Sequence, residues 1–177
     1  MKLLKILGIV LLLLVLVGLF LPTDYDIRRE VTIQAPAAKV HAWVGDLTKW
    51  PDWTPWQEHD PSTRVTLGAR TTGVGASQTW TSDGGDGELT FTACSPAEGI
   101  AYDMAFLMDG ERVPAQSTML YREQGGATTV TWTMQGDAAD FMPPVVGGYM
   151  NLVMKGAING EFDKGLAKLK QVVEAGG

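Results

Sequence analysis

The chain has 177 residues, of which 45% are hydrophobic and 19% are charged, and its formal net charge is −6. This acidic balance argues against binding to nucleic acids, which select basic surfaces, and against a domain held on an anionic membrane by charge alone. The single cysteine, Cys94, excludes an intramolecular disulfide, and two histidines, His41 and His59, are too few for a multi-histidine metal site. We therefore expect neither a metal nor a cofactor.

Residues 3–21 form an apolar run whose only charge, Lys5, lies close to one end. In a helix these residues reach about 28 Å, which is close to the hydrocarbon thickness of a bilayer. The run predicts one transmembrane helix, in an anchor of residues 1–23 that precedes a domain of residues 24–177. Because Lys2, Lys5 and the amino terminus precede the run, the positive-inside rule places that end in the cytoplasm and the domain on the exported, periplasmic side of the inner membrane.

A cleaved signal peptide is the alternative interpretation of this run. Signal peptides end in small residues at their cleavage site, whereas this run ends in the sequence GLFLP at residues 18–22. An uncleaved, single-pass anchor is therefore favoured. Arg28 and Arg29, which would be exported, count against the orientation that the positive-inside rule gives.

Residues 25–33 alternate between apolar and polar side chains, which predicts a strand with one apolar face. Arg29 interrupts that face, either as a cation at a cavity mouth or as the partner of a carboxylate near the strand's end. Pro36 ends the strand and begins a helix. The apolar stripe of this helix comprises Val40, Trp43, Val44 and Leu47.

Three tryptophans, Trp50, Trp53 and Trp56, follow within seven residues and are separated by Pro51 and Pro55. The prolines exclude a long helix or a central strand, so the segment predicts a short turn or a compact loop. Such a large apolar area is expected to be buried. It forms either a plug that seals one end of the core or an aromatic wall at the entrance of a pocket, and the two roles are compatible.

The middle of the chain reads as successive strands. Glycine-rich turns, of which residues 82–87 are the clearest, separate short alternating segments. Successive hairpins predict an antiparallel sheet with one solvated face. The expected strands are residues 64–67, 76–81, 88–94, 100–108, 113–122 and 128–135.

A loop is expected at residues 137–148, and from Met150 onward apolar residues repeat at helical spacing. They predict one long amphipathic helix that covers the apolar face of the sheet. Its glycines, Gly156, Gly160 and Gly165, each cost about 1 kcal/mol relative to alanine. Either the helix therefore packs closely against the sheet or its inner side leaves room for a guest.

Methionine and aromatic side chains gather on the inward faces of these elements. Flexible thioethers suit an adaptable apolar pocket, although an irregular and well-filled core gives the same pattern. The residues predicted to line a ligand cavity are Trp43, Trp53, Trp56, Trp80, Phe91, Tyr102, Met104, Phe106, Met119, Trp132, Met134, Met150, Met154, Ile158 and Phe162.

The sequence offers little for catalysis. It contains no nucleophile elbow, Walker loop or Rossmann fingerprint, and Cys94 has no evident activating neighbour. The acid–imidazole–acid triplet at residues 58–60 is adjacent in sequence, and adjacent residues rarely converge on one substrate. The remaining catalytic candidates are Glu161, Tyr102 and Arg29, with a pairing of Glu161 and Arg29 as the structural alternative. Without a nucleophile–base pair, a non-catalytic role is favoured.

Five segments carry a resemblance to a known family. They are REVTIQAP at residues 29–36, WPDWTPW at 50–56, GVGA at 73–76 followed by Trp80, TVTWTM at 129–134 followed by Gly136, and FDKGLAKLK at 162–170. With them the chain resembles the SRPBCC superfamily of START-like, helix-grip proteins, often described as polyketide cyclase/dehydrase or lipid-transport proteins. The resemblance implies an α+β fold in which a curved antiparallel sheet wraps around a long C-terminal helix, with an apolar cavity for lipids, sterols or polyketides.

The resemblance does not imply catalysis, because the superfamily mixes binders, transporters and enzymes, and its oxygenase members use iron-binding histidines that this chain lacks. The expected function is membrane-anchored binding, transport or sequestration of a hydrophobic small molecule or lipid. The alternatives are a cyclase- or hydrolase-type enzyme acting on a hydrophobic substrate, and a partner-binding module of the envelope that uses the tryptophan segment as its contact.

Overall fold

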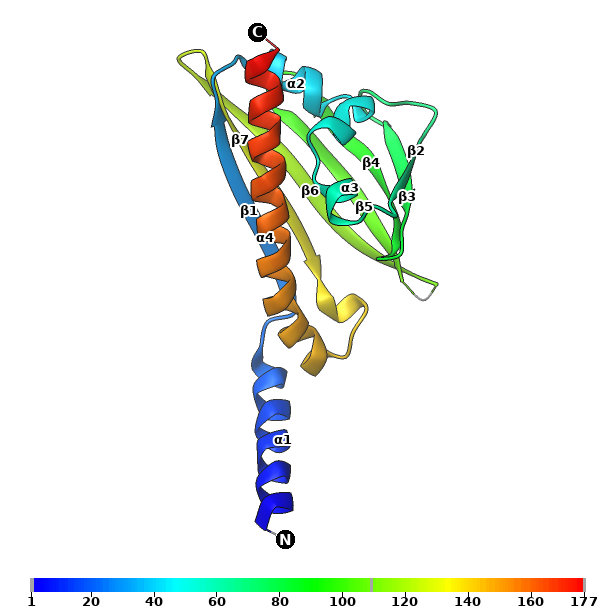
Figure 1. Ribbon diagram of the computed structural model, residues 1–177, viewed down its shortest axis with the longest axis vertical. Helices are drawn as coiled ribbons and strands as arrows, with labels where there is room; N and C mark the ends of the chain where they lie inside the picture. The colour runs from blue at the N-terminus through cyan, green and yellow to red at the C-terminus, as the bar shows by residue number, and fades with distance from the viewer. Residues whose placement is uncertain (1, 109, 177) are drawn as a thin grey trace.

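The computed structural model describes residues 2–108 and 110–176 and shows a sheet domain from which one helix projects (Figure 1). The helices are α1 (Lys2–Phe20), α2 (Ala37–Val44), the 3-10 helix η1 (Leu47–Asp52), α3 (Trp56–His59), the 3-10 helix η2 (Ala138–Asp140) and α4 (Pro144–Ala175). The strands are β1 (Asp24–Ile33), β2 (Arg64–Leu67), β3 (Ser77–Thr81), β4 (Asp86–Ser95), β5 (Gly99–Met108), β6 (Glu111–Gln124) and β7 (Ala127–Asp137).

The seven strands form one sheet in the order β1-β7-β6-β5-β4-β3-β2, and every neighbouring pair is antiparallel. Consecutive strands are joined by hairpins from β2 to β7. The turn between β6 and β7 has only two residues, Gly125 and Gly126, and both have positive φ, as the tightest hairpin turns require. β1 pairs with β7 instead of β2, so the first strand closes the edge that the last strand would otherwise expose.

The predicted α+β class and the helix-grip arrangement are confirmed. α4 packs beside β1 and its buried side chains, Phe162, Leu166, Leu169 and Val173, belong to the core. The tryptophan segment folds into η1 and α3, as a compact connection should, and covers another part of the same sheet face. Trp50 contacts Phe91 of β4 and Tyr102 of β5 there.

α4 begins earlier than the sequence indicated, because residues 144–148 are helical and do not belong to a loop. Gly147 and Gly148 suggested a turn, but both are buried in the first turns of the helix. A side chain at Gly148 would approach Leu21 Cβ to 2.5 Å, so this glycine permits close contact with the end of the N-terminal segment. The glycines therefore serve packing between segments and do not break the helix.

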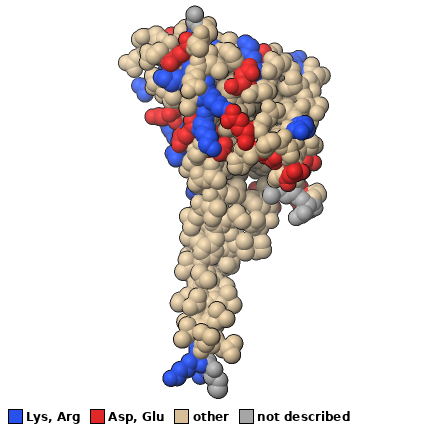
Figure 2. Space-filling view, viewed as in Figure 1, with Lys and Arg blue, Asp and Glu red and all other residues tan. Residues whose placement is uncertain are grey.

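α1 stands almost free of the domain. All its described side chains are exposed except at Gly18, which is buried against the start of α4. By length and composition this helix is able to cross a membrane, a property that signal sequences share. The charged residues of the domain lie in the upper part of Figure 2, and the stem below them is free of charge as far as the lysines at its tip.

The glycines of α4 divide into two kinds. A Cβ at Gly165 would lie 3.0 Å from Trp132 Cζ3 and 3.2 Å from Pro55 Cδ, so the helix approaches the core closely at that point. Gly156 and Gly160 are exposed, and a Cβ on either would meet nothing within 4 Å. The prediction of close packing holds for Gly165, whereas the other two glycines neither touch the sheet nor make room for a guest.

Candidate functional site

A cavity of about 540 Å³ lies on the concave face of the sheet, between the sheet and the helical segments that cover it. Its wall comes from η1, α3, α4 and all strands except β1 and β6. The side chains forming the apolar part of the wall are Trp50, Trp56, Val65, Trp80, Leu89, Tyr102, Met104, Phe106, Trp132, Met134, Met154, Ile158 and Phe162.

Ten of the residues predicted as ligand contacts lie in this wall. α3 supplies one of them, the sheet supplies six and α4 supplies three. They are Trp56, Trp80, Tyr102, Met104, Phe106, Trp132, Met134, Met154, Ile158 and Phe162.

Five predicted contacts lie elsewhere. Trp53, Phe91 and Met119 are fully buried in the solid part of the core, where Trp53 packs edge-on against Trp132. Trp43 lies under the Lys49 ammonium group, 5.3 Å from its ring centroid, at the domain surface. Met150 is on α4 but outside the cavity wall. Alternation identified the inward face correctly, but it does not indicate which end of that face is filled by protein.

Trp132 of β7 connects the solid core to the cavity. Its ring stacks on Phe162 of α4 with a centroid distance of 3.9 Å and an interplanar angle of 11°. Its indole N–H donates hydrogen bonds to the Tyr102 hydroxyl at 3.0 Å and to the Ser117 hydroxyl at 3.2 Å. Burial raises the pKa of Tyr102 to about 12, so its phenol stays neutral and serves as an acceptor for the indole.

The rim of the cavity is polar and is held together by hydrogen bonds. Asp60, which follows α3, accepts hydrogen bonds from the Ser62 backbone and hydroxyl at 2.9 and 2.5 Å and from the Gly84 N–H at 3.2 Å. The Ser62 hydroxyl accepts a further bond from the Asp83 N–H at 2.8 Å. The hydrogen bonds from Ser62 lower the pKa of Asp60. Asp60 thereby joins the end of α3 to the β3–β4 turn, and both border the cavity.

An ion pair and a polar contact join α3 to α4. Glu58 pairs with Lys168, and His59 Nδ1 lies 3.4 Å from Glu161 Oε1, which also accepts a hydrogen bond from Lys164 at 2.8 Å. The three members of the acidic and imidazole triplet therefore turn to different partners: Lys168, Glu161 and, for Asp60, the β3–β4 turn. They do not form a common catalytic group.

The three catalytic candidates do not meet. Tyr102 lies in the cavity wall, but neither Glu161 nor Arg29 belongs to it. Glu161 has a side chain only 12% exposed and is engaged with His59 and Lys164. Arg29 pairs with Asp163, with 3.2 Å between Nε and Oδ1, and not with Glu161 as the sequence suggested. The correct partner lies two residues farther along α4, a difference that helical spacing alone did not resolve.

Several wall residues were missed by sequence reasoning. Trp50 belongs to the recognised tryptophan segment and Leu89 to a recognised inward face, so the pattern contained both. Gln78 on β3 carried no such signal. It is 7% exposed and lines the cavity, and no hydrogen bond joins its side-chain amide to another described residue. This amide is therefore a polar group available inside a largely apolar wall.

Cys94 has a neighbour that the sequence did not reveal. Its sulfur lies 3.5 Å from His41 Nε2, and the Tyr121 hydroxyl lies 3.5 Å from His41 Nδ1. Burial raises the pKa of Cys94 and lowers the pKa of His41, so both side chains stay neutral. A thiolate–imidazolium pair of the kind that nucleophilic catalysis uses is therefore not favoured here.

Comparisons with known proteins agree with this architecture. A family model described as polyketide cyclase / dehydrase and lipid transport matches residues 25–174. A search of the curated proteins found no match.

Solved structures share the fold at low sequence identity. A hypothetical protein from Helicobacter pylori is 12% identical with a TM-score of 0.65, over 85% of this chain and 89% of that protein. A protein from Chromobacterium violaceum is 17% identical with a TM-score of 0.59, over 84% and 96% of the two chains. One from Thermus thermophilus is 18% identical with a TM-score of 0.58, over 86% and 99%. The family match covers nearly the whole domain, so this chain belongs to the polyketide cyclase/dehydrase and lipid transport family of the SRPBCC superfamily.

Proposed function

We propose that the protein binds a single hydrophobic small molecule or lipid in the cavity. The observation that carries this proposal is the cavity itself. Its volume of about 540 Å³ falls within the range of small-molecule sites, and its wall is mostly aromatic rings, aliphatic chains and thioethers. Methionines such as Met104, Met134 and Met154 allow such a wall to adapt to guests of different shape.

The guest is expected to carry one polar group. Burying an amide without a hydrogen bond costs free energy, so a purely hydrocarbon guest that displaces water from the cavity would leave the Gln78 amide unsatisfied. A hydroxyl or carboxyl group on the guest would satisfy that amide while the apolar remainder fills the wall. Fatty acids and sterols have this combination of features.

Membrane anchoring is the second part of the proposal, with residues 1–23 as the anchor and 24–177 as the binding domain. α1 is long enough to span the hydrocarbon layer and exposes apolar side chains along its whole length. Lys2 and Lys5 would hold its first turn in the cytoplasm and place the domain on the exported side of the inner membrane. The tether would keep the cavity close to the bilayer, where apolar guests accumulate.

The alternatives receive less support. An enzyme would need polar groups that converge on the guest. Of Glu161, Tyr102 and Arg29 only Tyr102 lies in the cavity wall, and the rim residues His59 and Asp60 are directed to separate partners, Glu161 and the β3–β4 turn. An envelope module that contacts partners through its tryptophans would expose them. Instead Trp53 is fully buried and Trp56 is half-buried between Trp132 and Phe162. Binding without chemistry is therefore favoured.

The test uses the full chain in lipid nanodiscs with a diazirine-bearing fatty acid as the probe. We expect saturable photolabelling with one adduct per chain, mapped to cavity-wall peptides and displaced by unlabelled oleate. Met154→Trp places a bulky ring inside the cavity and should weaken labelling at least tenfold. Leu120→Trp adds the same ring at an exposed position of β6 and is the matched control. Adducts confined to α1, or equal labelling of both variants, would refute binding in the cavity.

A further inference from the structure

The start of α4 presents an apolar surface that the domain does not cover. Residues 141–154 contain no charged side chain. Within them Val146, Leu152 and Val153 are 48%, 56% and 69% exposed. Other strongly exposed large apolar side chains of the described domain, such as Leu67 and Leu120, occur singly, as is normal for soluble surfaces. The cluster on α4 therefore needs a specific explanation.

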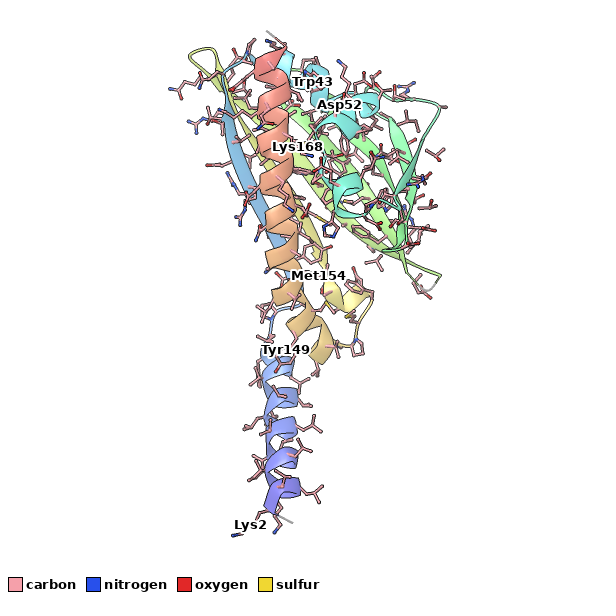
Figure 3. All side chains as sticks on the ribbon, in the orientation of Figure 1. Lys2, Trp43, Asp52, Tyr149, Met154 and Lys168 are labelled. Carbon is pink, nitrogen blue, oxygen red and sulfur yellow. The ribbon has the colours of Figure 1, made fainter. Side chains whose placement is uncertain are left out.

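This surface is continuous with that of α1. A Cβ at Gly18 would lie 2.7 Å from Val145 Cγ1 and 2.8 Å from Tyr149 Cε2, so the two helices touch where α1 has its small residue. The Tyr149 hydroxyl donates a hydrogen bond of 2.7 Å to the Leu14 carbonyl, which lies inside the membrane-length helix (Figure 3). The first turns of α4 therefore lie level with the last turns of α1. Small residues and polar bridges of this kind are typical of helix contacts in membranes.

Charged residues begin at about the same height after α1 and along α4. Asn151 donates hydrogen bonds of 2.8 Å to the carbonyls of Pro22 and Asp24, so it lies beside the first charged residue after α1. On α4 the first charged residue is Lys155, about one turn beyond Asn151. Figure 2 shows the same boundary: the charged residues of the domain lie above it, and the stem below it shows no charge until the lysines at its tip.

We propose that the first turns of α4, residues 144–154, enter the outer edge of the bilayer beside α1, with residues 144–148 at the depth of the last turn of α1 and residues 149–154 in the interfacial layer. This inference rests on the proposed anchoring by α1. The interfacial layer is roughly 5–8 Å thick on each side of the hydrocarbon, and the rise from Tyr149 to Val153 is about 6 Å, so residues 149–153 fit within it. The Tyr149 hydroxyl points toward the membrane interior, where the Leu14 carbonyl satisfies it.

Lipid explains this surface better than a second protein does. Its apolar side chains end at the level where charges begin on both segments, a boundary that a membrane requires and that a protein partner does not. The adjoining surface of α1 is also suited to lipid. A consequence is that the cavity wall on α4 begins at the membrane surface, with Met154 at the level of the lipid headgroups and Ile158 about one turn beyond it. An apolar guest would then cross little water between bilayer and cavity.

The test places a nitroxide label at single cysteines in the full chain, with Cys94→Ser as background, reconstituted in phosphatidylcholine–phosphatidylglycerol vesicles. The labelled variants are Leu12→Cys in α1, Val146→Cys and Val153→Cys in α4, and Leu120→Cys in β6. All four positions are exposed, so the labels should be tolerated. We expect oxygen to relax the label more strongly than a water-soluble nickel chelate at positions 12, 146 and 153, with depth decreasing in that order, and the reverse at position 120.

The outcomes distinguish the membrane placement of α4 from the proposed anchoring by α1 and from the proposed guest. A lipid signature at position 12 with aqueous behaviour at both 146 and 153 would overturn the inference and leave the anchor intact. Aqueous behaviour at position 12 as well would overturn both the placement of α4 and the anchoring by α1. A failure of fatty-acid labelling in the cavity, with positions 146 and 153 still in lipid, would refute the proposed guest but support the membrane placement of α4.

Discussion

Trp132 is the residue on which the solid core and the cavity wall both depend. One face of its ring stacks on Phe162, its edge contacts Trp53 and Trp56, and its N–H is satisfied by two hydroxyls. Because the hydroxyl of Tyr102 accepts this N–H inside an apolar wall, the polar atoms of both rings are satisfied without a guest. The hydrogen-bonding capacity left for a guest is therefore concentrated at Gln78 and at the rim.

His41 predicts a measurable pH dependence of stability. Burial lowers its pKa below the ordinary value of 6.5, so near pH 6 the unfolded chain binds more protons than the folded chain. The free energy of unfolding should therefore fall as the pH is lowered through about 6.5 and stop falling below the folded-state pKa. Replacement by a neutral residue, His41→Gln, should remove this slope.

Chemical denaturation of the full chain in detergent micelles between about pH 5 and pH 8 measures the effect. The carboxylates of Asp60 and Glu174 have lowered pKa values, and they lose their stabilising charge only at more acidic pH in both proteins. An unchanged slope in the His41→Gln variant would show that His41 is as solvated in the folded chain as in the unfolded one.

At the scale of single residues, the sequence identified faces better than positions along them. Alternation in β5 and β7 placed Tyr102, Met104, Trp132 and Met134 on the inward face, and all four line the cavity. It did not separate them from Met119, which points the same way into solid core. That difference depends on where η1 and α3 cover the sheet, and long-range packing of two short helices leaves no periodic signal in the chain.

α4 has one part packed against the core and one part exposed to solvent, and each part contains a glycine. Gly165 lies against Trp132 and Pro55 in a packed region, whereas Gly160 faces open space. Gly165→Ala should destabilise the protein, because overpacking a core costs roughly 1–3 kcal/mol and outweighs the gain in helix propensity of about 1 kcal/mol. Gly160→Ala should stabilise it by roughly 0.5–1 kcal/mol, because only the propensity changes.

The two alanine variants are each other's control, since they make the same chemical change in the same helix. Thermal or urea unfolding of both in one detergent provides the comparison. Shifts of the same sign would mean that α4 does not approach the sheet at Gly165 as closely as described.

At the scale of elements, the sequence predicted every strand, the apolar N-terminal helix and the long closing helix. It failed at residues 144–148, where two consecutive glycines and two prolines normally indicate a loop. Here Pro144 is the first residue of the helix, where proline is tolerated, and Gly148 allows contact with Leu21. The prolines and glycines at residues 143–148 were ambiguous in sequence, because the contact that accounts for Gly148 is made with Leu21, more than a hundred residues earlier in the chain.

Along the long axis of the molecule, the apolar helix α1 comes first, the apolar start of α4 next and the cavity after it (Figure 1). The apolar N-terminal helix, the inward face of the sheet and the family were predictable from the sequence, because an unbroken apolar run, alternating strands and a set of motifs indicate them. The polar contacts between α3 and α4 and the hydrogen-bonded rim at Asp60 were not predictable from the sequence, because surface carboxylates and lysines have many geometrically acceptable partners. The guest's chemistry is constrained only by the size of the cavity and by Gln78.

The central claim is that the space between α4 and the sheet holds one apolar guest. Native mass spectrometry of the full chain released from nanodiscs, after collisional removal of loosely bound lipid, tests it most directly. We predict a single adduct of lipid or sterol mass on the unmodified chain and on Leu120→Trp, and its loss from Met154→Trp. A bare chain in all three proteins, or identical adducts in all three, would contradict the claim.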